Sequence, residues 1–290
     1  MQLRRPAEPL ALVDLPAGRP RIVRGIATRG GDPPMRVLRT GGRLVYHGAA
    51  GVRAIDLALK EPPERLGATG YFIPSATDGR VWLMFLDKHE RDLARVAEVT
   101  VDGRVTTRGG KPPCRGVSVL RATAEALLCQ DDASRQLAFD PETGRVLRRL
   151  PGPFPLDTHG SRVAWCAERC PELHLTDVAG GSDTEVEPGP GFRFEETYEG
   201  AFSPDGSLLA APVRTCGGRR VALVDVDAGT ARVIAGPRLA GYRNLAWSSS
   251  GRRLYYNAGR GRIAAYDRAS GRTRLLPFRL SSQVLDMAAS

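Results

Sequence analysis

Two cysteines in the segment C-A-E-R-C, Cys166 and Cys170, are the residues in this sequence whose type and spacing most directly suggest chemistry. Such a pair could hold a metal ion, carry out thiol exchange or form a disulfide. Structural zinc takes four ligands, and the sequence holds no second C-x-x-C or H-x-x-H pair. Redox pairs are spaced C-x-x-C and stand at helix N-termini, where the dipole lowers the thiol pKa. The choice among these readings depends on the elements around the pair.

Other potentially catalytic side chains are dispersed along the chain. The four histidines are His47, His89, His159 and His174. Asp131-Asp132 and Glu195-Glu196 could form paired carboxylates, but adjacent residues in a strand point to opposite sides. No G-x-S-x-G elbow, P-loop or dinucleotide-binding motif is present. We therefore predict no catalytic residues, no metal and no cofactor.

An internal repeat organises the sequence. Seven short apolar runs end in aspartate at intervals of 37 to 48 residues, at Asp14, Asp56, Asp102, Asp140, Asp177, Asp225 and Asp267. Five of them continue as D-x-x-x-G. This pattern indicates a turn, because Asp accepts hydrogen bonds from the turn amides and Gly adopts positive φ. Each aspartate therefore marks a hairpin, with calcium binding as the alternative role.

A second pair of β-prone runs precedes each hairpin, so a unit of about 42 residues contains four strands. Four short antiparallel strands at this period predict β-propeller blades. We expect an all-β fold, a single seven-bladed propeller domain over residues 1–290. Its ring would be closed by P-L-A-L-V-D-L near the N-terminus and Q-V-L-D-M-A-A near the C-terminus. Six blades are the alternative, if the terminal strands pack elsewhere.

One blade carries a recognisable motif. The segment G-A-F-S-P-D-G-S-L-L, and more loosely L-A-W-S-S-S-G-R-R-L, resembles the WD40-like repeat of TolB-type propellers. The close match covers residues 202–208. This resemblance implies a protein-binding or ligand-binding propeller, in bacteria often outside the cytoplasm, with no shared catalytic residues. The order of the repeat units and the segment C-P-E-L-H-L-T-D also resemble uncharacterised actinobacterial propeller proteins.

The charge composition says little about partners. The net charge is +10, from 42 basic and 32 acidic residues, and nearly all basic residues are arginines. They are scattered and interleaved with Asp and Glu, without the basic stripe that nucleic-acid binding requires. The longest apolar stretch, Leu208 to Val213, is far shorter than the roughly 20 residues of a membrane helix. We expect a monomer without nucleic-acid partners or membrane insertion.

The predicted assignment of residues to blades and strands places all five cysteines near one face of the propeller. In a propeller, the connections between blades and the loops between the second and third strands open on the same face, here called the top. Cys166 and Cys170 flank a tight hairpin tip on this face, a position whose geometry favours a disulfide over free thiols or a metal site. Cys114 and Cys129 could form a second bridge, which leaves Cys216 unpaired.

Disulfides form in oxidising compartments. We therefore expect the native protein to be extracytoplasmic or membrane-anchored, with a signal or anchor that preceded Gln2 removed and Met1 as an added start. A cytoplasmic location is the alternative.

The top-face loops are rich in aromatic residues and arginine, the types that dominate binding hot spots. The candidate binding residues are Phe154, Phe192, Arg193, Phe194, Tyr198, Arg238, Tyr242 and Arg243. We predict a non-enzymatic binding module whose top face recognises a protein, peptide or glycan. The loop aromatics could instead only pin the loops to the blades. The alternative function is a lyase or hydrolase that uses top-face carboxylates and arginines at the central tunnel.

Overall fold

The computed structural model describes most of the chain. The described residues are 8–14, 19–28, 37–48, 51–58, 62–67, 71–86, 93–114, 119–131, 133, 135–152, 154–197, 199–241 and 245–280. Every regular element in these ranges is a β-strand. Across this part of the chain, no helix is long and apolar enough to span a bilayer.

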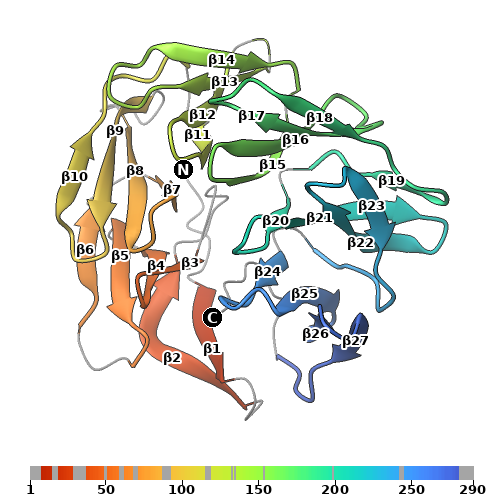
Figure 1. The fold of residues 1–290 in the computed structure, drawn as a ribbon. Coiled ribbons are helices and arrows are strands. Elements are labelled where there is room, and N and C mark those ends of the chain that lie inside the picture. Colours follow the sequence, from red (N-terminus) through yellow and green to blue (C-terminus); the bar gives the residue numbers. More distant parts are fainter. Residues whose placement is uncertain are drawn as a thin grey trace, which may run out of the picture.

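The strands form six antiparallel blades arranged around a common axis, and β3, β7, β11, β15, β20 and β24 lie nearest the axis (Figure 1). Blade 1 contains β3 (Val37–Thr40), β4 (Arg43–Gly48), β5 (Gly51–Asp56) and β6 (Glu64–Gly67). Blade 2 contains β7 (Tyr71–Pro74), β8 (Arg80–Leu86), β9 (Leu93–Thr100) and β10 (Val105–Arg108). Blade 3 contains β11 (Val119–Ala122), β12 (Leu127–Gln130), β13 (Gln136–Phe139) and β14 (Val146–Leu150).

Blades 4 to 6 complete the set. Blade 4 contains β15 (Phe154–His159), β16 (Arg162–Cys166), β17 (Leu173–Asp177) and β18 (Asp183–Val186). Blade 5 contains β19 (Phe192–Phe194), β20 (Ala201–Phe202), β21 (Leu208–Thr215), β22 (Gly218–Asp225) and β23 (Thr230–Val233). Blade 6 contains β24 (Leu245–Trp247), β25 (Arg253–Gly259), β26 (Arg262–Asp267) and β27 (Arg272–Leu275).

The prediction of seven blades is wrong, and the six-bladed alternative is the one observed. The N-terminal run forms a two-stranded hairpin of β1 (Glu8–Asp14) and β2 (Arg19–Thr28). This hairpin lies between blades 6 and 1 (Figure 1) and joins the sheet of blade 1 through the pair Thr28 and Gly48. Two strands do not make a four-stranded blade. The expected C-terminal partner, within residues 281–290, lies outside the described residues.

Both faces of blade 5 are buried, because this blade packs between blades 4 and 6. In β21, Leu209 belongs to a cluster with Leu173 of blade 4, whereas the next residue, Ala210, belongs to a cluster with Trp247 of blade 6. All but Trp247 are fully buried. Adjacent strand residues point to opposite sides, so a continuous apolar run such as L-L-A-A-P-V supplies both interfaces.

Six of the seven recurrent aspartates lie at the turns between the third and fourth strands of a blade, as predicted, whereas Asp14 ends β1 of the N-terminal hairpin. Asp177 shows the pattern: its Oδ1 accepts hydrogen bonds from the amides of Ala179 and Gly180, each at 2.9 Å. Gly181 takes φ 78° and donates to the carbonyl of Asp177. The amide of Gly180 in particular stabilises the charged carboxylate and lowers the pKa of Asp177. The aspartate thus closes the turn itself.

Both expected disulfides are present. Cys114 and Cys129 are joined with their Cα atoms 6.1 Å apart, and Cys166 and Cys170 with theirs 5.0 Å apart. The second bridge closes the hairpin tip, where Arg169 and Cys170 take positive φ. The exposed Cys216 is a free cysteine. The two cysteines of C-A-E-R-C therefore form a disulfide.

Candidate binding site at the top of blade 5

The hairpin of β21 and β22 brings arginines together at the top of blade 5. Its register pairs Thr215 with Gly218 and therefore Arg214 with Arg219. On the other side of β21, β19 pairs Arg193 with Arg214. Directly opposed residues on neighbouring strands share one face of the sheet. Three arginines therefore form a row across three strands.

Two glutamates from the segment between β19 and β20 neutralise part of this row. Glu195 forms an ion pair with Arg214, whose Nη2 lies 2.9 Å from Glu195 Oε1, and accepts a hydrogen bond from Arg219 Nε. Glu199, whose side chain is 3% exposed, accepts from Arg219 Nη2 at 2.9 Å. Arg219 also donates to the carbonyl of Gly241. Burial acts to lower the pKa of Arg219, but its contacts with both glutamates outweigh burial and raise this pKa.

The outer arginines remain accessible. Arg193 is exposed, and the Arg214 side chain is 55% exposed despite its ion pair. Arg238 is exposed and lies over Gly218, where an added Cβ would stand 3.3 Å from its Nε. Arg220 donates to the carbonyl of Gly236 at 2.7 Å. We call Phe192, Arg193, Arg214, Arg220 and Arg238 the blade-5 rim.

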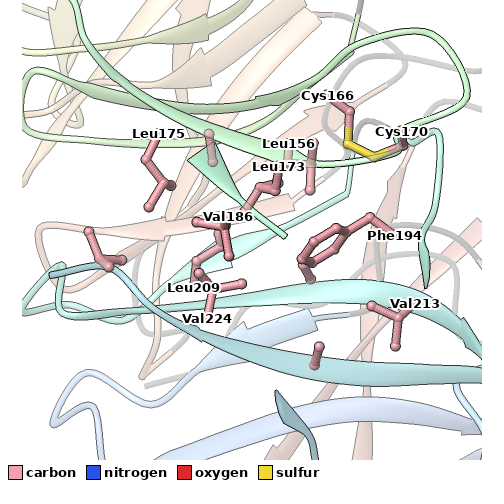
Figure 2. Packing of buried hydrophobic residues seen from close by; sticks show 14 of the residues in the cluster. Leu156, Cys166, Cys170, Leu173, Leu175, Val186, Phe194, Leu209, Val213 and Val224 are labelled. Carbon is pink, nitrogen blue, oxygen red and sulfur yellow. A yellow bond between two sulfur atoms is a disulfide. The ribbon is translucent and has the colours of Figure 1, made fainter. Parts of the chain in front are cut away.

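The rim stands on a rigid base. The rings of Phe192 and Phe194 meet edge to face, with centroids 5.9 Å apart. Phe194 is 2% exposed and packs in the cluster that contains the Cys166–Cys170 disulfide (Figure 2). Phe194 is therefore a core residue beneath the rim, whereas the half-buried Phe192 reaches its surface.

The structure thus brings together Phe192, Arg193 and Arg238 of the predicted binding residues. The side chains of Phe154, Tyr198, Tyr242 and Arg243 lie outside the described residues. Sequence reasoning missed Arg214, Arg219 and the ion pairs of Glu195 and Glu199. A two-residue tip in R-T-C-G-G-R would have placed Arg214 opposite Arg219, because the tip length fixes the register of a hairpin.

A second place where carboxylate and arginine meet lies on the innermost strands. Asp157 on β15 accepts from the amide of Phe202 on β20 at 2.7 Å. Its Oδ1 lies 3.7 Å from Arg121 Nε on β11, and Arg121 Nη2 donates to the carbonyl of Leu156 at 3.0 Å. Burial raises the pKa of Asp157, with Arg121 acting in the opposite direction. These contacts link blades 3, 4 and 5 near the axis.

The described histidines do not gather at one place, and only His159 lies near Asp157. His47 is buried in β4, His159 packs near Phe202, and His174 stacks on Trp165 with a ring distance of 4.1 Å. In the described ranges, no group of three or more His, Cys, Asp or Glu side chains could hold a metal ion.

Known proteins resemble this chain in architecture alone. No protein-family model and no curated protein sequence matches the chain. Apo AztD from Citrobacter koseri superposes with a TM-score of 0.52 at 13% identity, covering 93% of this chain and 78% of that one. KlHsv2 with loop 6CD replaced by a Gly-Ser linker gives 0.60 at 9% identity, covering 87% and 85%. At such identities, the likeness supports the fold only.

In its described part, the chain is a β-propeller with six antiparallel blades, of four strands each except blade 5, in which both β19 and β20 pair with β21.

Proposed function

We propose that this propeller is a non-enzymatic binding module whose top-face loops recognise a macromolecular partner, with the blade-5 rim as the central contact. The observation that carries the proposal is the gathering of exposed Arg193, Arg214 and Arg238 around one hairpin tip beside Phe192. Arginine and aromatic side chains dominate the energetics of protein interfaces. The disulfide-braced core below keeps this surface preorganised, which reduces the entropy cost of binding.

The two disulfides support an extracytoplasmic or membrane-anchored location, because such bridges persist in oxidising compartments. The motif at residues 202–208 supports a TolB-like, WD40-like repeat, and the arginine-rich composition supports an actinobacterial source. A single domain and a monomeric state complete the proposal.

Affinity capture with one variant and one matched control tests the binding role. Arg238→Glu reverses a charge on the rim, and Arg272→Glu makes the same change on the exposed outer strand β27. We expect proteins captured from a native envelope extract by the wild type to be retained by Arg272→Glu. The Arg238→Glu variant should lose them. Identical capture by all three proteins would contradict the proposal.

A further inference from the structure

The charges at the top of blade 5 do not balance within the described part of the chain. Glu195 and Glu199 are both engaged with Arg219, and Glu195 also with Arg214. Among the described residues, no carboxylate lies within ion-pair distance of Arg193 or Arg238. Arg193 nevertheless stands directly opposite Arg214 across the strand pair. Like charges at directly opposed positions destabilise a sheet.

This arrangement differs from the arginines at the bottom of the same region. Arg268 donates to Asp205 at 2.8 Å, and Arg162 lies 3.4 Å from Asp227. Both pairs join neighbouring blades and are satisfied inside the protein. At the rim, Arg193 and Arg238 are instead exposed with no such carboxylate among the described residues, and Arg214 is 55% exposed despite its ion pair.

We infer that the blade-5 rim binds an acidic polypeptide segment, with Arg193 and Arg214 as the principal carboxylate contacts. This inference rests on the proposed function and gives the partner its chemistry. Guanidinium groups bind carboxylates in bidentate pairs of strong hydrogen bonds. The two arginines stand on strands about 5 Å apart, so they can engage two carboxylates of one segment. Phe192 lies next to Arg193 but on the opposite face of β19, where its ring meets that of Phe194.

Arg219 acts as a positioning residue in this site. It holds Glu195, which in turn orients Arg214, and its contacts with Glu199 and Gly241 join three segments of the chain. The exposed Arg214 is therefore connected through Glu195 to a buried ion-pair network. The positive net charge of the protein adds long-range attraction for an acidic partner.

The test uses a short fluorescein-labelled peptide in which Glu alternates with Gly, and anisotropy as the measure of binding. We expect saturable binding that weakens with rising salt, and none to the same peptide with Gln in place of Glu. Arg193→Glu should weaken binding by at least about tenfold, and Arg214→Gln should weaken it as well. The matched charge reversal Arg274→Glu on β27 should stay within about twofold of the wild type.

Equal losses in Arg193→Glu and Arg274→Glu would overturn the inference, because binding would then follow net charge alone. Tighter binding of a heparin oligosaccharide, lost in Arg193→Glu, would also overturn it in favour of a sulfated glycan. Either failure leaves the proposed function intact if Arg238→Glu still loses captured partners. Failure of both experiments would remove the binding role itself. Arg193 has no carboxylate partner in the described residues, so its substitution should leave the fold unchanged.

Discussion

The two ends of blade 5 use the same charged side chains in opposite ways. At the bottom, Asp205 accepts from Ser203 at 2.5 Å, from Ser207 at 2.8 Å and from Arg268 at 2.8 Å. At the top, exposed Arg193 and Arg238 have no such carboxylate among the described residues. The bottom end therefore satisfies Asp205 and Arg268 internally, whereas the rim has exposed guanidinium donors without a carboxylate partner among the described residues.

The two ends also differ in how they repeat. At the bottom, the residue after the turn aspartate donates to the preceding turn of the same blade in three successive blades: Val178 to Ser161, Val226 to Ser207 and Arg268 to Arg252, at 2.9 to 3.0 Å. At the top, the ion-pair network of Arg219 and the disulfides have no such regular spacing. The repeated contacts stabilise the individual blades, whereas the irregular contacts are features of this sequence in particular.

Removing Arg219 should give the largest effect on stability. Arg219→Met removes the ion pairs that Arg219 makes with Glu195 and with the buried Glu199, and breaking a buried pair costs about 3 kcal/mol or more. Arg268→Met at the bottom breaks an exposed pair and should cost less than about 1 kcal/mol. Urea unfolding of both variants measures the difference. Equal costs would erase the distinction between a buried network at the top and exposed pairs at the bottom.

The disulfides should contribute next. The Cys114–Cys129 bridge spans 15 residues, and the loop-closure estimate assigns it roughly 3 kcal/mol. The Cys166–Cys170 bridge spans 4 residues and should contribute roughly 2 kcal/mol. Paired Cys→Ser variants, unfolded by urea under non-reducing conditions, give these values.

Intact mass supplies the control for the disulfide variants. We expect one reactive thiol, that of Cys216, in the unfolded, non-reduced protein. Five reactive thiols would show that the top face has no covalent brace, and would also remove the support for an oxidising compartment.

The regular part of the structure could be predicted from sequence. The spacing of the aspartates located each turn, because an aspartate that closes a turn needs only local backbone amides. The strand pairs around C-A-E-R-C located the disulfide for the same reason: hairpin register is a local property. The number of complete blades was not local, since it depends on where the terminal strands pair.

The rim could be predicted only in part. The sequence indicated the arginines and aromatics of the top-face loops, but placed Phe192, Arg193 and Phe194 in a loop and not in a strand. In the structure, Phe192–Phe194 forms β19 and pairs with β21, and β20 pairs with β21 again after an insertion between the two strands. The inserted residues carry Glu195 and Glu199 to Arg219. Such an insertion is stabilised by tertiary ion pairs, which no periodic pattern reveals.

Two aspartates should give smaller effects of opposite sign. Burial raises the pKa of Asp157, so its contribution to stability is full below the unfolded pKa and is lost as pH rises through the folded pKa. Asp157→Asn keeps an acceptor for the amide of Phe202 and cannot ionise. We expect it to be more stable than the wild type at neutral pH, by less than either disulfide contributes, with the gap closing in acid.

For Asp205 the sign reverses. Hydrogen bonds from Ser203, Arg268 and Ser207 lower the pKa of Asp205, so its contribution is present above the unfolded pKa and lost as pH falls through the folded pKa. Asp205→Asn should therefore be less stable than the wild type at neutral pH and equal to it in acid. Unfolding curves across pH measure both variants. If Asp157→Asn were also destabilised at neutral pH, the attraction to Arg121 would outweigh burial, and the axis would be held by charge as the bottom is.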